Sequence, residues 1–338
     1  GRLESKTLSE ADEFGNVYYH YMNTELNLMD QKIMALEDAD GALAYDYEYY
    51  AGTSKFKVVN GYSSLGTPSS TPFDIRVRKY EYDADGINVL KKYTYFKDAD
   101  NRLESLTLRS ADVDGNVYYS YTNDALHLLT AKVLASPDTM GAMGYTYEYW
   151  PGTDKYKKVI GYSSADYADP KNVIYSGKLI TYEYATDGVT LTAKYTYYYA
   201  SGMIESATFS SADTYGNVYY HYTDENFGGR GYGLVDKQVR ASVDAEGAIA
   251  YYMEYYPGTD KLKKKVGYSS ADYSDPKDVK LTGQVFAYEY DLDGNVIDVK
   301  YTYYASGYLE SKTLKTADPD GNVYYHYMDD AANKMDRK

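Results

Sequence analysis

The chain has 338 residues, a net charge of −15 and no cysteine, and tyrosine supplies 48 of its residues against 7 phenylalanines and 1 tryptophan. The negative charge disfavours nucleic acid as a partner, and the lack of cysteine excludes disulfides and thiolate metal sites. No apolar run is long enough to predict a membrane span.

The sequence is a tandem array. The heptapeptide GNVYYHY, or GNVYYSY in the second copy, begins at Gly15, Gly115, Gly216 and Gly321, each time after a Leu/Ile-Glu-Ser signature. We expect repeats at 1–100, 101–201 and 202–306 and the start of a fourth at 307–338, with an insertion, NFGGRGYGL, at 226–234. Both ends interrupt the pattern in mid-unit and neither resembles a polar cap, which indicates a section of a longer array.

Alternation of tyrosine with polar residues predicts β-strands along each repeat. In the first copy we expect Tyr-x-Tyr strands at 17–22, 44–50, 79–83 and 92–96, and Leu/Val/Lys strands at 29–36, 55–59 and 87–92. Asp-Gly pairs such as Asp85-Gly86 predict two-residue hairpin turns between them. The expected fold class is therefore all-β: tandem repeats of antiparallel hairpins that form a continuous coiled sheet, as in a solenoid, a spiral shell or a fibre.

The repeated heptapeptide carries aromatic rings on both faces of its strand. Tyr19 and Tyr21 fall on one face, and Tyr18 and His20 on the other, so we expect a central strand that is covered on both sides. Cross-strand ring pairs would then stabilise a thin sheet without a deep core. The predicted structural aromatic positions are Tyr18, Tyr19, Tyr21, Tyr118, Tyr119, Tyr121, Tyr219, Tyr220, Tyr222, Tyr324, Tyr325 and Tyr327.

Two further segments of the repeat have distinctive composition. The strands at 155–158 and 261–265 are rich in lysine, which natural edge strands use against unwanted pairing. The segments that follow, 161–172 and 267–278, are rich in Ser, Asp and Pro and are expected to be long surface loops; the first repeat has SSLGTPSSTP at 63–72 there. O-linked sugar on 63–71 or on the GYSS segments stays open.

Three windows resemble the tyrosine-aspartate (YD) repeat of the Rhs family. They are YEYDLDGNVIDVKYTYYASGYLESKT at 288–313, YEYDADGINVLKKYTY at 80–95 and TYEYATDGVTLTAKYTY at 181–197. The resemblance implies an extracellular or secreted protein whose repeats wind a β-sheet into a shell. The family's motif before a C-terminal toxin is not present, so toxin delivery is not implied. GNVYYHYMD at 321–329 has a weaker likeness to aromatic cell-wall-binding repeats.

Candidate metal and catalytic sites each have a simpler structural interpretation. His20, His221 and His326 recur at one position and could form a row, but the second copy has Ser120 there, which is poor coordination chemistry. The Asp-x-Asp-Gly turns are a candidate calcium site, yet two of the four copies lack the second acid. No nucleophile or phosphate-binding motif is present, and repeats supply identical copies where an enzyme needs one unique site. We therefore expect no enzyme, no metal and no cofactor.

The sequence favours a structural protein whose partner is itself, through neighbouring repeats or further copies of the chain. This role predicts a β-rich filament, fibre or shell segment outside the cell or on its surface. One alternative is a module that binds polysaccharide or cell wall through Tyr149, Trp150, Tyr255 and Tyr256. Another is an Rhs-like β shell that encloses cargo.

Overall fold

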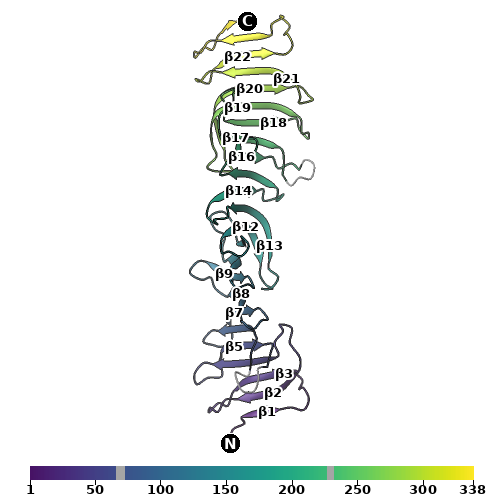
Figure 1. Cartoon of the computed structure of the whole chain (residues 1–338), viewed down its shortest axis with the longest axis vertical. Coiled ribbons are helices and arrows are strands. Elements are labelled where there is room, and N and C mark those ends of the chain that lie inside the picture. The colour runs from purple at the N-terminus through teal and green to yellow at the C-terminus, as the bar shows by residue number, and fades with distance from the viewer. Residues whose placement is uncertain (66–72, 227–231) are drawn as a thin grey trace. The chain divides into compact units, whose positions relative to one another are not determined.

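The computed structural model describes residues 1–65, 73–226 and 232–338, and all regular structure in these ranges is β (Figure 1). The 24 strands are assigned to one sheet, and within β1–β11 and within β13–β24 consecutive strands pair antiparallel. The expected all-β class of tandem antiparallel hairpins is therefore confirmed. The loop expected at 63–72 and the insertion at 226–234 fall partly outside the described residues.

The chain divides into two compact units, which we describe separately. The first unit contains residues 1–155 and 161–176. Its strands are β1 (Ser5–Thr7), β2 (Asn16–Tyr21), β3 (Met29–Met34), β4 (Ala44–Tyr49), β5 (Phe56–Tyr62), β6 (Arg76–Tyr82), β7 (Val89–Tyr95), β8 (Leu103–Leu108), β9 (Asn116–Tyr121), β10 (Leu129–Leu134) and β11 (Gly144–Tyr149).

The second unit contains residues 156–160 and 177–338, so that β12 (Tyr156–Asp166) and β13 (Ile174–Tyr184) contribute to both units. Its remaining strands are β14 (Leu191–Tyr197), β15 (Ile204–Phe209), β16 (Asn217–Tyr222), β17 (Val235–Arg240), β18 (Ala250–Tyr255), β19 (Leu262–Asp272), β20 (Lys280–Tyr290), β21 (Ile297–Tyr303), β22 (Leu309–Leu314), β23 (Tyr324–Tyr327) and β24 (Met335–Arg337).

The expected strand boundaries need three corrections. The separate strands at 87–92 and 92–96 are one strand, β7, which pairs with β6 from Val89 to Thr94 without a turn; Lys91 and Tyr93 simply share one of its faces. The turns between strands are also longer than the expected two residues: Asp12 N donates to Asn16 O at 3.1 Å, which leaves three residues in the loop, and Asp83 N donates to Asn88 O at 3.0 Å, which leaves four. Gly15, at φ +77°, takes the left-handed position that the three-residue loop requires.

The segments 161–172 and 267–278 are not long surface loops, which is the third correction. Their GYSSAD halves continue the strands β12 and β19, which reach 11 residues each. In the second of them, Ser270 pairs with Thr282 and Asp272 with Lys280 of β20. Only the Asp-Pro part turns, so these segments are the long arms of hairpins.

The lysine-rich strand at 261–265 is not a sheet edge, because β19 pairs with both β18 and β20. Its lysines instead meet acids and rings on the neighbouring strands. Lys263 Nζ lies 2.5 Å from Glu254, and Lys265 Nζ lies 4.1 Å from the centroid of the Tyr251 ring. At 155–158, Lys158 similarly pairs with Glu183 of β13 at 3.3 Å.

Successive copies of the repeat run in opposite directions within a unit. Seven antiparallel pairings lead from β2 to β9, so the second GNVYY strand is reversed relative to the first. Equivalent side chains of the two copies therefore lie on opposite faces of the sheet. Direct cross-strand partners run from His20 through Gln31, Asp46, Asn60, Lys79, Tyr93 and Leu106 to Tyr119, not to Ser120.

The second unit repeats this relation. Seven antiparallel pairings also join β16 to β23, and the cross-strand partners starting at His221 end at Tyr325. Partners starting at Tyr220 end at His326. Each repeat contains an odd number of antiparallel strands, so the next repeat is related to it by a half-turn about the direction in which the strands stack. Equivalent residues of successive repeats therefore lie on opposite faces and at opposite lateral edges of the sheet.

Candidate functional site

Each GNVYY strand is preceded by a turn in which one aspartate binds both the backbone and a tyrosine. Asp12 Oδ1 accepts hydrogen bonds from the backbone N–H of Phe14 at 3.0 Å and of Asn16 at 2.9 Å. Asp12 Oδ2 accepts from the hydroxyl of Tyr19, seven residues along the chain. We call this arrangement the Asp-Tyr clamp. It recurs as Asp38–Tyr45, Asp112–Tyr119, Asp138–Tyr145, Asp213–Tyr220, Asp244–Tyr251 and Asp318–Tyr325.

The clamp shifts the acidity of both partners. The hydrogen bond from Tyr119 lowers the pKa of Asp112 below its usual range. Burial, and then the hydrogen bond to Asp112, raise the pKa of Tyr119 to about 12; burial and the hydrogen bond to Asp213 raise the pKa of Tyr220 to about 12. The clamp thus holds a carboxylate and a neutral phenol at neutral pH.

The clamp also accounts for the turns that were considered for calcium. Both oxygens of the first aspartate already accept hydrogen bonds from the chain itself. Within residues 1–65, 73–226 and 232–338, no group of three or more His, Asp or Glu side chains could hold a metal ion. The Asp-to-Tyr spacing of seven residues is visible in the sequence and could have revealed the clamp.

The other face of the GNVYY strand is covered in the second and third repeats. Tyr118 is 2% exposed, and its hydroxyl donates to Pro170 O at 2.7 Å beneath the long hairpin arms of β12 and β13. Tyr219 is 0% exposed and donates to Pro276 O at 2.6 Å beneath β19 and β20. Rings from the arms pack on them: Tyr167 at 6.1 Å and Tyr273 at 5.8 Å between centroids.

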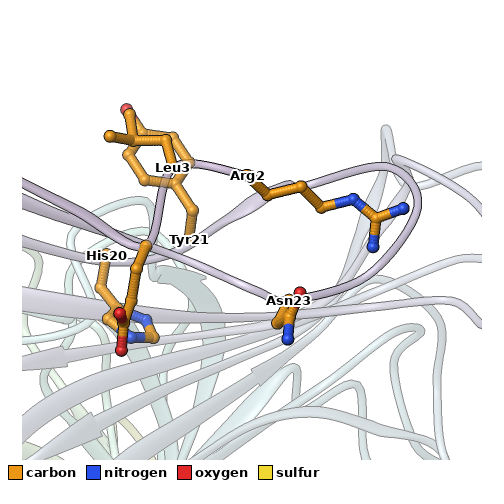
Figure 2. Close-up of a pocket in the computed structure, with 6 residues that line it drawn as sticks. Arg2, Leu3, His20, Tyr21 and Asn23 are labelled. Atoms are coloured by element: carbon orange, nitrogen blue, oxygen red, sulfur yellow. The ribbon is translucent and has the colours of Figure 1, made fainter.

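A pocket of about 420 Å³ lies at the first GNVYY strand (Figure 2). His20 and Tyr21 of β2 line it together with Arg2, Leu3 and Asn23. The imidazole Nδ1 of His20 lies 2.6 Å from Asp30 on β3, and the side chain keeps 32% of its surface exposed.

The corresponding places in later repeats are occupied by an aromatic residue from the repeat before. Tyr198, just after β14, donates its hydroxyl to Tyr222 O at 2.5 Å and sets its ring edge-on to His221. Ser201 then hydrogen-bonds Asp224, the counterpart of Asn23. The exposed fraction of the His221 side chain is correspondingly only 14%.

The next boundary is built in the same way. Tyr304 donates to Tyr327 O at 2.8 Å, its ring lies edge-on to His326, and Ser306 hydrogen-bonds Asp329. We call this arrangement the repeat joint. At the first boundary, Phe96 takes the aromatic position and lines a pocket of about 260 Å³ with Ser120 and Tyr121. The joint was not foreseen, because its partners come from different predicted repeats.

The histidines do not form a row. Within each unit, the register puts the His position of one repeat on the opposite face from that of the next, so His221 and His326 cannot share a ligand through stacking. Each instead pairs with an aspartate of the adjacent strand at 2.6 Å, Asp236 or Asp336. In the second repeat Ser120 and Thr130 replace this pair and hydrogen-bond at 2.7 Å.

The remaining predicted aromatic residues differ in their surroundings. Tyr121 stacks on His127 at 4.9 Å, Tyr222 lies 5.2 Å from the Tyr232 ring, and Tyr324 is 40% exposed. The candidate glycan residues lie at the end of a strand and the turn after it. The hydroxyls of Tyr149, Tyr255 and Tyr256 donate to Leu129 O, Val235 O and Tyr290 O, and Trp150 O accepts from Thr153.

No protein-family model and no curated protein matches the chain. Among solved structures it is similar to TcdB2-TccC3, with 11% identity over 94% of this chain and a TM-score of 0.17. It is also similar to TcdB2-TccC3 without its hypervariable C-terminal region (13%, 94%, 0.20) and to the Tc holotoxin pore of Photorhabdus luminescens (11%, 99%, 0.18). The chain spans 17% of the length of each of these chains. At these TM-scores the likeness assigns neither a family nor an activity.

No helix among the described residues is long and apolar enough to cross a membrane.

Proposed function

We propose that the chain is a structural protein, a tandem-repeat β scaffold in which strand pairing and aromatic joints hold successive repeats together as one object. The proposed setting is a filament, fibre or shell outside the cell or on its surface. The chain's partner is then itself, and the scaffold has no catalytic role. The Rhs resemblance of the sequence favours the shell among these forms.

The observation that carries this proposal is the repeat joint. At 201/202 and 306/307, Tyr198 and Tyr304 donate hydrogen bonds to backbone oxygens of the following repeat. The same boundaries are crossed by the β14–β15 and β21–β22 ladders. Independent beads on linkers would carry neither contact, because domain boundaries fall where few contacts cross.

The distribution of buried apolar side chains supports the same role. The buried clusters are small, such as Val117, Tyr118 and Val133 in the second repeat and Ala248, Tyr251, Phe286 and Tyr288 in the third. Such clusters are too small for a domain that stands alone, whereas stacked repeats borrow stability from their neighbours.

Electron microscopy of the native material tests this function. Extended fibres or closed shells with a regular repeat along the sheet are the expected result. Isolated globular particles at all concentrations would contradict the proposal. The Tyr198→Ala variant, which removes one joint without touching a strand, should shorten or irregularise the assemblies, whereas Tyr199→Ala, a matched change at a side chain that is 75% exposed, should not.

A further inference from the structure

The pocket of about 260 Å³ at the joint between the first and second repeats lies within one compact unit. The joint contributes Phe96, Glu104, Ser120 and Thr130 to its lining, and the arm of β12 and β13 contributes four residues between 170 and 175. A cavity of about 150 Å³ is enough to hold a benzene ring. This pocket therefore has room for a small ring that carries a substituent.

The third repeat shows which side chains are missing from this pocket. At its equivalent joint, His221 and Asp236 pair at 2.6 Å, where the second repeat has Ser120 and Thr130. This replacement removes the whole imidazole ring and leaves two small hydroxyls that bond each other at 2.7 Å. Since Ser120 and Thr130 both line the pocket, it includes the place that an imidazole ring holds one repeat later.

The aromatic residue of the joint is also smaller here. Tyr198 donates its hydroxyl to Tyr222 O at 2.5 Å in the third repeat, whereas Phe96 has no hydroxyl to donate. Phe96 keeps the aromatic ring, which in the third repeat stands edge-on to the imidazole of His221 with 6.4 Å between centroids. The pocket thus retains the ring neighbour of the imidazole and lacks the imidazole itself.

The carboxylate of Glu104 lines the pocket without a close partner. Its counterpart, Glu205, accepts a hydrogen bond from Thr196 at 3.2 Å and pairs with Lys277 at 3.3 Å. Lys171 takes the position of Lys277, but among the residues that the structure describes Glu104 makes no ion pair and no hydrogen bond. Burial raises the pKa of Glu104, and the charge of Lys171 offsets this only in part. Glu104 is therefore free to accept a hydrogen bond from a ligand.

Tyr175 supplies an unused donor on the arm side of the pocket. Its ring packs on Tyr162 at 5.3 Å between centroids, but its hydroxyl is buried and has no hydrogen-bond partner in the described part of the chain. Leu281 holds this position in the third repeat, so the arm does not need the hydroxyl in order to fold. Because a buried hydroxyl without a partner lowers stability, a ligand with an acceptor atom would satisfy it.

We propose that this pocket binds a small base built on an imidazole ring, in the place that the His221 side chain holds in the third repeat. Neutral imidazole carries one N–H donor and one acceptor nitrogen. Glu104 accepts from the N–H, Tyr175 donates to the other nitrogen, and Phe96 supplies an aromatic wall. Occupancy stabilises the first joint, because the ligand binds only the folded chain. The binding role is additional to the scaffold, and a folded chain that does not assemble would still show it.

Titration calorimetry of the full chain with imidazole and with methylimidazole tests the pocket. We expect one site per chain with a dissociation constant of about 1 mM or below, in keeping with a ligand of so few atoms. The variant Ser120→His/Thr130→Asp builds the pair of the third repeat into the pocket. It should weaken binding at least about tenfold, because the chain then supplies the imidazole ring itself.

The variant Tyr175→Phe tests the hydrogen bond with a smaller change. It should weaken binding by about tenfold, because the acceptor nitrogen of the ligand loses its donor. Tyr215→Phe, the same change at a side chain that is 77% exposed and outside the pocket, is the matched control and should leave the affinity unchanged. Circular dichroism shows which variants are folded, and the two Phe variants decide the question if the double variant is not.

Four results would overturn the assignment: no saturation at about 10 mM imidazole, an unchanged affinity in Ser120→His/Thr130→Asp, an unchanged affinity in Tyr175→Phe, or equally tight binding of benzene. Benzene has the ring but neither the donor nor the acceptor, so equal binding would reduce the pocket to an apolar void. A short histidine-containing peptide is the last probe. Tighter binding of this peptide than of methylimidazole would assign the pocket to a histidine side chain of another protein and also overturn the proposal.

Discussion

The first and third copies of the repeated heptapeptide are identical, yet they sit in different surroundings. Tyr219 is completely buried under the long arms of β19 and β20, whereas Tyr18 keeps part of its surface exposed. The corresponding strands of the first repeat, β5 and β6, have 7 residues each instead of 11. The contribution of one tyrosine to stability is therefore decided by a hairpin more than fifty residues away, at Pro276.

The largest difference between the two repeats is expected when the rings of Tyr18 and Tyr219 are removed. Tyr219→Ala should lower the free energy of unfolding by about 3–5 kcal/mol, because it leaves a cavity under the arms, and Tyr18→Ala by only about 1 kcal/mol. Urea denaturation followed by fluorescence measures both values. Equal losses of unfolding free energy for the two variants would show that the long hairpin arms do not determine how much this tyrosine contributes to stability.

A second difference between repeats concerns one buried position on the sixth strand. Arg78 in the first repeat is 6% exposed and pairs with Asp38 at 3.3 Å and with Asp40, whereas Ile180 and Phe286 hold this position in the other repeats. A glycine on the neighbouring strand makes room for it: a Cβ at Gly61 would lie 2.8 Å from Arg78 Cγ.

Arg78→Ala should cost about 2–4 kcal/mol in urea denaturation, because it removes a side chain that is only 6% exposed and leaves the half-buried carboxylate of Asp38 without its cation. The double change Arg78→Ile/Asp40→Met introduces the residues of the second repeat and should restore stability to within about 1 kcal/mol of the original, since apolar packing can replace a buried ion pair. A double variant as unstable as Arg78→Ala would mean that the apolar residues of the second repeat cannot replace the ion pair of the first.

The Asp-Tyr clamps predict how stability depends on pH. The pKa of Tyr119 is raised to about 12, so above the unfolded value of 10 the folded state retains a proton that the unfolded chain releases, and stability falls from pH 10 through 12. The pKa of Asp112 is lowered from 3.8, so its contribution is present above that pH and is lost as the pH falls further.

Thermal unfolding followed by circular dichroism from pH 2 to 12 measures this dependence. We expect a plateau between about pH 5 and 9 with losses on both sides. Tyr119→Phe should reduce the loss of stability above pH 10. The loss of stability at acid pH should occur at the same pH as before, because the other clamps determine it. A melting temperature that stays flat from pH 9 to 12 would contradict the clamp.

The smallest effect is expected at the joint histidines. His221→Ser/Asp236→Thr copies the hydrogen-bonded pair of the second repeat, Ser120 and Thr130, and should change stability by less than about 1 kcal/mol. His221→Ser alone should cost about 1–2 kcal/mol, since Asp236 loses its partner. A double-mutant cycle with no coupling between the two positions would show that the pair contributes nothing.

Local pattern predicted the tyrosine-rich strands of this chain, but it missed the Leu-Glu-Ser strands such as β8 and the GYSSAD arms. Tyr45-Asp46-Tyr47 alternates with period two and lies in β4 as expected. The GYSSAD arms were mistaken for loops because serine and aspartate are common in turns, although cross-strand partners such as Thr282 settle them as strand. The Lys261–Lys265 strand was mistaken for an edge because its lysines were interpreted without the acids opposite them, although Glu254 of the preceding strand, which pairs with Lys263, is only nine residues away.

The prediction that the histidines could form a row was wrong for a different reason. Sequence recurrence shows that His221 and His326 are equivalent. Whether equivalent residues share a face depends on whether the number of strands per repeat is odd or even. That number could not be predicted, because the expected strands at 87–92 and 92–96 are one strand, β7, and the Leu-Glu-Ser segment forms a further strand, β8, that was not expected; the corresponding strands before His326 are β21 and β22.

Native-state hydrogen exchange at the boundary between the second and third repeats tests the scaffold most directly. The amides of the β14–β15 ladder, such as Tyr195 and Ala207, should be protected to the same degree as those of the β16–β17 ladder inside the third repeat, and both should open in one cooperative step. Boundary amides that exchange through a separate, lower-energy opening would show independent beads and contradict the account.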